Sequence, residues 1–228
     1  MNNILVLGDG LLGTELVSQL QCDYISRKKD GIDFCEEGSY LGHLKDYDVI
    51  INCIGNVDTY SDDKQSHWDV NFKGVARLCD YCHDNNKKLV HISTDYLYAN
   101  SKENASELDV PSNACNWYSY TKLLSDGYIQ LKGKRYLLIR TSFKKEPFDY
   151  KYGWMIKGNF DYTSIIAEKI IQLIKEGCNG IYNVGTEVKS LYDLGKRSNP
   201  SLIPTAEYIH ESVPRNVTMD ISKMESII

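Results

Sequence analysis

The chain has 228 residues, of which 42% are hydrophobic and 25% charged, the composition of a globular protein with a sizeable core. Its net charge of −5 gives no reason to expect a nucleic-acid partner, because phosphate binding usually requires a basic patch. The first apolar run, "ILVLG", is too short for a signal peptide or a membrane span. We therefore expect a cytoplasmic protein with no membrane partner, whose seven cysteines are reduced.

Strand-like and helix-like segments alternate along the chain. Short apolar runs predict strands in residues 3–8, 22–26, 47–55, 87–94 and 135–143. Apolar residues at helical spacing predict helices in residues 11–20, 68–82 and 117–131. Strands separated by helices imply parallel pairing with right-handed crossovers. The sequence therefore predicts an α/β fold with a doubly wound parallel sheet (Rossmann).

The pattern loosens after Phe143, where one helix (165–174) and one strand (180–185) remain. We therefore predict a dinucleotide-binding core over residues 1–143. The remaining residues, 144–228, are predicted to form a small substrate-covering segment that is partly interleaved with the core.

A glycine-rich turn follows the first predicted strand. Gly8, Gly10 and Gly13 form the pattern G-x-G-x-x-G between a strand and a helix. The first glycine permits a tight turn, the second lets a pyrophosphate approach the backbone, and the third lets helix and strand pack closely. The helix N-terminus offers free N–H groups to phosphates. The pattern favours dinucleotide binding, although glycines also occur in ordinary strand-to-helix turns.

The residues after the second strand indicate which dinucleotide binds. An NAD site usually has an acid there, whereas an NADP site has a cation for the 2′-phosphate. Here Ser26, Arg27 and Lys28 follow the strand, and the first acid is Asp30. Arg27, helped by Ser26 or Lys28, favours NADP(H), with NAD(H) as the alternative cofactor. An exposed basic turn without a ligand is the other interpretation.

Tyr118 and Lys122 are one helical turn apart in "WYSYTK" and share one face of the predicted helix. A tyrosine has an unperturbed pKa of about 10, too high for efficient proton exchange near neutral pH. A neighbouring ammonium lowers that pKa and makes the phenol a usable general acid. Tyr120 lies on another face. The spacing also arises by chance in a chain with 17 tyrosines, so aromatic packing stays open as the alternative.

The fourth predicted strand ends in Ser93-Thr94-Asp95-Tyr96. Ligands of open α/β sheets bind outside the carboxyl ends of the strands. A hydroxyl at this position could hold a carbonyl oxygen opposite Tyr118.

Six motifs now stand in the order found in extended short-chain dehydrogenases/reductases: the glycine pattern, "NCIGNVD", "VNFKG", "STDYLY", "YSYTK" and "IRTSF". In detail the chain most resembles the dTDP-4-dehydrorhamnose reductase family of nucleotide-sugar reductases. The resemblance covers residues 1–143 well and the tail loosely, through "GIYNVG" and "PRNVTMDISK". It implies NADPH-dependent reduction of the C4 carbonyl of a 4-keto-6-deoxy nucleotide sugar. The partner would be that nucleotide-linked sugar, and the resemblance leaves room for a homodimer.

The resemblance also implies roles for single residues. Tyr118 would donate the proton, and Lys122 would bind the nicotinamide ribose and lower the tyrosine pKa. Thr94 would orient the substrate carbonyl. Asp95 and Phe143 would contact the substrate, Phe143 standing where the family usually has tryptophan. Besides the three glycines, Arg27 and Lys122, the cofactor cleft would be lined by Leu11, Leu12, Asp33, Phe34, Gly55 and Asn56.

Two departures from related families qualify this reading. Sugar-nucleotide dehydratases have an acidic pair after the threonine, whereas here Asp95 is followed by Tyr96, so simple reduction is favoured. Family members are usually longer after the position of Phe143, so the substrate subdomain is abbreviated and the sugar nucleotide is left open. A non-catalytic NADP-binding regulatory subunit of the same fold is the alternative function.

"CDYCH", Cys79 to His83, reads literally as a haem attachment site. Both cysteines lie on the apolar stripe of the helix predicted from Trp68, so two small core residues are expected and no metal is predicted. His91, inside a strand, is expected to be a hydrogen-bonded interior residue, and Asn71, in "VNFKG", a structural one.

Overall fold

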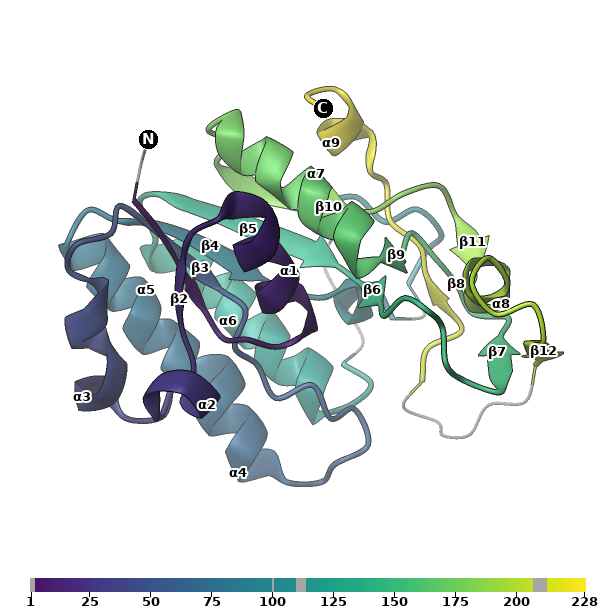
Figure 1. Ribbon diagram of the computed structural model, residues 1–228, viewed down its shortest axis with the longest axis horizontal. Coiled ribbons are helices and arrows are strands. Elements are labelled where there is room, and N and C mark those ends of the chain that lie inside the picture. Colours follow the sequence, from purple (N-terminus) through teal and green to yellow (C-terminus); the bar gives the residue numbers. More distant parts are fainter. Residues whose placement is uncertain (1–2, 100, 110–113, 207–212) are drawn as a thin grey trace.

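A six-stranded parallel sheet forms the centre of the computed structural model, which describes residues 3–99, 101–109, 114–206 and 213–228 (Figure 1). The strand order is β10-β5-β4-β3-β1-β2. The strands are β1 (Ile4–Leu7), β2 (Asp23–Ile25), β3 (Val49–Asn52), β4 (Lys88–Ile92), β5 (Tyr136–Thr141) and β10 (Gly180–Val184). The predicted parallel α/β sheet is confirmed.

Helices cover both faces of this sheet. α1 (Leu11–Leu20) and α7 (Thr163–Lys175) lie together on one face, and α5 (Val75–Asp84) and α6 (Trp117–Lys132) lie on the other (Figure 1). Alternate residues of the strands pack into two separate hydrophobic cores, one on each face of the sheet. All four residues of β3 are buried. Burial on both faces explains why the strands appear in the sequence as continuous apolar runs.

The helix between β3 and β4 differs from the prediction. It begins at Lys64 with α4 (Lys64–His67), widens into a π-helical segment over Trp68–Gly74 and continues as α5. The regular spacing had predicted one uninterrupted helix over 68–82. π-Helical turns often accompany functional sites, and this one carries Asn71 into the interior. Cys79 and Cys82 lie on the buried face of α5, in the hydrophobic core, as predicted.

The part of the chain after β5 belongs partly to the sheet and partly to a second lobe at the right of Figure 1. β10 is the edge strand of the main sheet, and α7 packs on α1. The lobe has its own apolar cluster, Phe148, Phe160, Tyr162, Leu194 and Leu202. The division into two domains at residue 143 stays a prediction.

Short elements complete the described structure. Those beside the sheet are α2 (Arg27–Asp30), α3 (Glu37–Tyr40) and the 3₁₀-helices η1 (Leu41–Leu44) and η3 (Asp95–Tyr98). Those after β5 are β6 (Phe143–Lys144), β7 (Tyr152–Trp154), β8 (Lys157–Gly158), β9 (Asp161–Tyr162), β11 (Lys189–Ser190), α8 (Leu191–Lys196), β12 (Ile203–Thr205), β13 (Asn216–Val217) and α9 (Ser222–Glu225).

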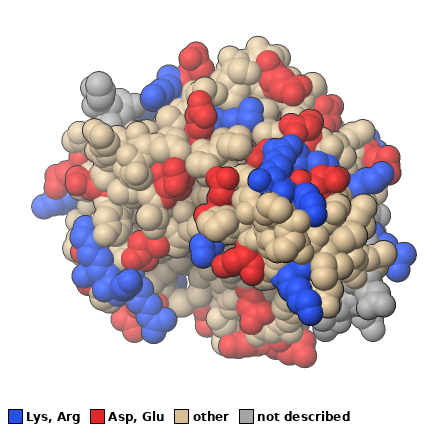
Figure 2. Space-filling view, turned by 45° about the vertical axis from the view of Figure 1, so that its right-hand side comes forward, with Lys and Arg blue, Asp and Glu red and all other residues tan. Residues whose placement is uncertain are grey.

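Acidic and basic side chains are interspersed over the face of the molecule shown in Figure 2. All seven cysteines are free thiols. Across the described residues, no helix is both long enough and apolar enough to cross a membrane.

Candidate active site

The glycine turn lies where the strand order reverses, between β1 and β3, the usual place for a ligand in such sheets. Gly8 has a φ of +96°, a conformation that favours glycine. A Cβ on Gly13 would lie 2.1 Å from the Gly8 carbonyl oxygen, so helix and turn pack too closely for any side chain. A Cβ on Gly10 would meet no atom within 4 Å. The tight turn at Gly8 and the close packing at Gly13 are those expected of the pattern, and the space beside Gly10 is open.

The N-terminus of α1 is suited to an anion. Gly10 is its N-cap and supplies no side-chain cap, and the first turn contains no acid. No side chain caps the N–H groups of this helix end, and the space that a Gly10 Cβ would enter is open. Leu11 is exposed and Leu12 is buried in the core, so Leu12 can contribute to this cradle only through its backbone.

The basic turn predicted to select the cofactor begins α2. Arg27 and Lys28 are exposed. Ser26 is buried and caps the helix, accepting from the Lys29 amide at 3.0 Å, while its hydroxyl donates to Asp9 Oδ2 at 3.0 Å. Because that hydroxyl is already engaged, Lys28 is the better candidate to assist Arg27.

Asp33 and Phe34 follow α2 and lie differently from one another. Asp33 is exposed, and its Oδ1 accepts from the Cys35 amide at 2.8 Å. The Phe34 ring is buried, with its centroid 5.1 Å from that of Tyr40. A Cβ on Gly74 would lie 2.6 Å from this ring. The ring of Phe34 therefore packs in the core, and only its backbone is placed to line a cleft.

The loop after β3 is fixed by Asn71 from the π-helical segment. Asn71 Oδ1 accepts from the Asn56 amide at 2.8 Å, and Asn71 Nδ2 donates to the Asn56 carbonyl at 2.9 Å. The same side chain bonds with Thr121 of α6 at 3.3 Å. The structural role predicted for Asn71 is confirmed, and through it the loop that carries Gly55 and Asn56 is held after the carboxyl end of β3.

Thr94 and Tyr118 meet at the carboxyl end of β4. Thr94 is buried and caps η3, accepting from the Tyr96 amide at 3.2 Å. The pKa of Tyr118 is not lowered as the sequence predicted: burial raises it to about 12, and a side-chain hydrogen bond with Thr94 opposes that rise. The Tyr96 ring stands edge-on to the Tyr118 ring, with centroids 5.9 Å apart. Tyr120 is 39% exposed on another face of α6, as its position predicted.

Lys122 lies on the inward face of α6 and is buried. Its Nζ donates to the Ile92 carbonyl at 2.6 Å and lies 3.0 Å from His91 Nε2. Burial lowers the pKa of Lys122 to about 8, against the attraction of Asp126. His91 is fully buried with hydrogen-bond partners on both nitrogens, as predicted.

Two buried residues near Lys122 were not predicted as site residues from the sequence. Asp126, one further turn along α6, is fully buried and accepts from Arg140 Nε of β5 at 3.1 Å. Arg140 also donates to the Tyr98 hydroxyl at 2.6 Å. Asp126 could have been found from its spacing, because Tyr118, Lys122 and Asp126 are each four residues apart on α6. Nothing in the sequence indicated that Asp126 pairs with Arg140 on a strand.

Asp95 is buried next to Thr94, whose hydroxyl donates to Asp95 Oδ1 at 3.4 Å. Burial raises the pKa of Asp95 to about 7, opposed first by the charge of Lys144 and then by Thr94. Burial also lowers the pKa of Lys144. Phe143, which the resemblance places against the substrate, is half-buried in β6, next to Lys144.

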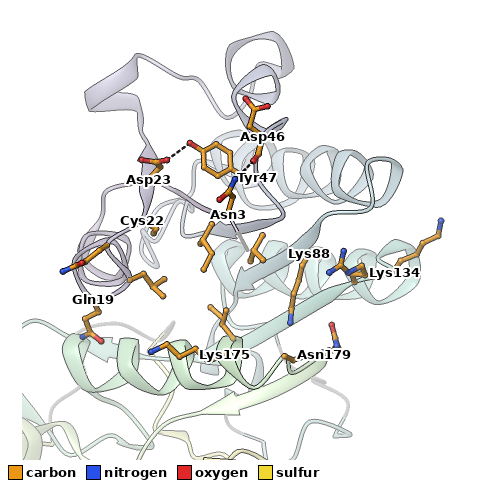
Figure 3. Close-up of a pocket in the computed structure, with 17 residues that line it drawn as sticks. Asn3, Gln19, Cys22, Asp23, Asp46, Tyr47, Lys88, Lys134, Lys175 and Asn179 are labelled. Carbon is orange, nitrogen blue, oxygen red and sulfur yellow. Dashed lines mark hydrogen bonds between the residues drawn. The ribbon is translucent and has the colours of Figure 1, made fainter. Parts of the chain in front are cut away.

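One cavity lies away from these residues. It has a volume of about 1270 Å³ and opens at the amino ends of β1, β3, β4 and β5. Lys88, Lys175 and Asn179 lie around its lower side in Figure 3, opposite Asp23 and Tyr47. A smaller cavity of about 460 Å³ lies at the N-terminus of α6 and is lined by Tyr60, Trp117 and Tyr120 among others. Neither cavity is lined by Thr94, Tyr118 or Lys122, and the candidate site lies at the carboxyl ends of the strands.

Comparison with known proteins finds relatives of this chain. A dTDP-4-dehydrorhamnose reductase of Mycolicibacterium smegmatis is 28% identical over 114 residues, which cover 49% of this chain and 35% of that protein. The match thus spans about a third of that relative's length. A hypothetical dTDP-4-dehydrorhamnose reductase from Sulfolobus tokodaii has a TM-score of 0.85 at 22% identity, covering 99% of this chain and 94% of the other.

The dTDP-4-dehydrorhamnose reductase of Bacillus anthracis, solved in complex with NADP, has a TM-score of 0.83 at 17% identity, covering 99% and 92% of the two chains. At these identities the solved structures establish the shared Rossmann fold. The family described as the RmlD substrate binding domain matches residues 1–144. That match spans more than half of the sequence, and the chain belongs to the RmlD substrate binding domain family.

Proposed function

We propose that this chain is an NADPH-dependent reductase of the C4 carbonyl of a 4-keto-6-deoxy nucleotide sugar. The observation that best supports this proposal is the grouping of Thr94, Tyr118 and Lys122, which come from two separate elements. They lie at the carboxyl ends of the strands, where the glycine turn also lies. Membership of the family and the reductase names of the relatives support the same reaction.

The residues present fit a dinucleotide. The space left by Gly10 and the uncapped N-terminus of α1 suit a pyrophosphate, and the exposed Arg27 suits a 2′-phosphate. The complex of the Bacillus anthracis relative with NADP supports that preference, and NAD(H) is the alternative cofactor. When bound, NADPH supplies a hydride to the carbonyl carbon.

Tyr118 completes the reduction by giving its phenolic proton to the carbonyl oxygen. With a pKa raised to about 12, the phenol stays protonated at neutral pH, and it becomes an efficient donor only as its phenolate form is stabilised. The phenolate left behind is stabilised by the Thr94 hydroxyl, and it regains its proton from solvent. The ammonium form of Lys122, one helical turn away, would add to that stabilisation. Thr94 also orients the carbonyl oxygen opposite Tyr118.

The residue that follows Asp95 favours reduction over dehydration. Elimination of water needs an additional acid and base, and Asp95 is followed by Tyr96, whose ring packs on Tyr118. Asp95, half-protonated near neutral pH, and Phe143 would line the substrate side of the site.

The direct test is oxidation of NADPH by the purified chain with dTDP-, UDP-, GDP- and CDP-linked 4-keto-6-deoxy sugars. The proposal predicts turnover with at least one of them and the matching alcohol as product. NADPH binding without turnover of any sugar would instead support the non-catalytic regulatory subunit.

A further inference from the structure

A chain of buried hydrogen bonds connects the end of β3 to Lys122. The Ile54 amide donates to Asn52 Oδ1 at 3.0 Å, and Asn52 Nδ2 lies 3.2 Å from His91 Nδ1. Across the imidazole ring, His91 Nε2 lies 3.0 Å from Lys122 Nζ. Lys122 in turn donates to the Ile92 carbonyl at 2.6 Å. Asn52 and His91 are fully buried, so water cannot replace these partners.

The first link fixes the proton positions along this chain. A side-chain amide oxygen only accepts and its nitrogen only donates. Because the Ile54 N–H donates to the side-chain oxygen of Asn52, the side-chain nitrogen of Asn52 is the atom that faces His91. Turning the amide over would set two buried donors against each other, which costs the free energy of an unmade hydrogen bond. His91 Nδ1 must therefore accept, and the single proton of the neutral ring lies on Nε2.

An imidazolium form of His91 is disfavoured at the same place. It would carry protons on both nitrogens and direct Nδ1–H at the Asn52 NH₂ group. Burial, and then the neighbouring Lys122, lower the pKa of His91 well below its usual value of 6.5.

Lys122 consequently faces an N–H group across 3.0 Å. An ammonium has three donors and no acceptor, whereas an uncharged amine has one lone pair that can accept from His91. The other groups facing Lys122 are Asp126 from its own helix and the Cys53 thiol after β3. Asp126 also forms an ion pair with Arg140, whose Nε lies 3.1 Å from Asp126 Oδ2. The negative charge of Asp126 therefore balances a positive charge on Lys122 only in part.

We propose that Asn52 and His91 are positioning residues for Lys122: Asn52 fixes the imidazole tautomer, and the Nε2–H of His91 favours the uncharged amine of Lys122. The catalytic consequence rests on the proposed function. A lysine that titrates near neutral pH must carry its proton before it can stabilise the Tyr118 phenolate, so this pair sets the alkaline limit of the reduction.

The tautomer is measured on the cofactor-free, full-length chain by long-range ¹H–¹⁵N correlation spectra of ¹⁵N-histidine-labelled protein. The His91→Gln spectrum assigns the His91 signals by their loss. We expect a neutral ring with its proton on Nε2 from about pH 5.5 to about pH 8.5. A proton on Nδ1, or an imidazolium in this range, would overturn the proposal without any variant having to fold.

Asn52→Asp tests the relay further. A carboxylate only accepts, so it takes both the Ile54 N–H and a proton placed on His91 Nδ1. Nε2 then becomes an acceptor for the Lys122 ammonium. The spectra should show the proton moved to Nδ1, and the alkaline limb of the pH profile of kcat/KM should move up by about one pH unit.

A double variant separates the relay from the added charge. In the His91→Gln background, Asn52→Asp should move the alkaline limb much less, because no imidazole passes the change on. An equal shift in both backgrounds would mean that charge acts through space and would contradict the relay. If no sugar is turned over, the proposed function fails while the tautomer measurement still decides the pair.

Discussion

Burial sets the protonation of the side chains around the candidate site. The pKa of Tyr118 is raised to about 12 and that of Asp95 to about 7, while that of Lys122 is lowered to about 8. The site thus holds a protonated phenol between two groups that titrate near neutral pH. The spacing of Tyr118 and Lys122 was readable in the sequence. The partners of Lys122 were not, because Asn52 and His91 come from two strands whose adjacency only the sheet defines.

Asp95 makes stability depend on pH with a sign opposite to that of most carboxylates. Its pKa is raised from 3.8 to about 7 in the folded chain, so the folded state holds the proton more tightly than the unfolded state. Stability is therefore greatest at the acidic end of this window and is lost as the pH rises towards about 7. Asp95→Asn removes the titration and should be more stable than the parent at neutral pH.

Urea unfolding of both proteins at several pH values checks this, and the advantage of Asp95→Asn should shrink as the pH falls towards about 4. Asp109→Asn is the control of opposite sign. The pKa of Asp109 is lowered to about 2, first by Lys102, so its contribution is present at neutral pH and is lost in acid. An Asp95→Asn advantage that does not change with pH would show that Asp95 does not titrate in this window.

Arg27 should decide between the two dinucleotides. Replacing Arg27 with Asp removes a charged hydrogen bond to the 2′-phosphate and should weaken NADPH binding by about 1.5–3 kcal/mol. NADH binding, which involves no such phosphate, should be spared. Titration calorimetry with both cofactors measures the difference, and Lys175→Asp, at the opposite edge of the sheet, is the charge-matched control. Unchanged NADPH affinity in the Arg27 variant would assign the preference elsewhere.

Among the elements, the turn from β1 into α1 gives Gly13 and Gly10 different surroundings. A Cβ on Gly13 would collide with the Gly8 backbone at 2.1 Å, whereas a Cβ on Gly10 would enter open space. The sequence pattern alone predicts close packing at Gly13 and a phosphate beside Gly10. Elsewhere periodicity fell short: it predicted the buried face of α5 but not the wide turn over Trp68–Gly74, because Asn71 and its partners on another loop are not encoded in the apolar spacing.

Gly13→Ala and Gly10→Ala should therefore fail in different ways. Overpacking at Gly13 should lower the free energy of unfolding by about 3 kcal/mol. Gly10→Ala should change it by less than about 1 kcal/mol, yet weaken NADPH binding on the order of tenfold. Chemical unfolding and fluorescence titration of NADPH measure the two effects. Equal loss of stability in both variants would contradict an open cradle at Gly10.

At the level of the whole molecule, the second half of the chain completes the first. The sequence predicted a helix over 165–174 and a strand over 180–185, and both exist as α7 and β10. Their place in the main sheet was not readable, because pairing with β5 depends on where a long connection returns. The apolar pattern showed each element, whereas the edge it joins is a property of the packed chain.

A chain that ends after Lys144 should consequently not fold as an independent domain. It would expose the apolar edge strand β5 and uncover α1, which packs on α7. We expect aggregation or the loss of cooperative unfolding, measured by size-exclusion chromatography and circular dichroism. A soluble, cooperatively unfolding fragment would show that residues 1–143 form an independent domain.

The central claim is that Tyr118 transfers a proton during carbonyl reduction, and one pair of variants tests it most directly. Tyr118→Phe removes a hydroxyl that matters only as charge develops on the carbonyl oxygen, so turnover of a 4-keto sugar nucleotide should fall by about 10²–10⁴-fold. NADPH affinity should barely change. Tyr120→Phe makes the same chemical change two residues away, on the exposed face of α6, and should keep near-normal turnover. Equally mild effects of the two substitutions on turnover would contradict the account.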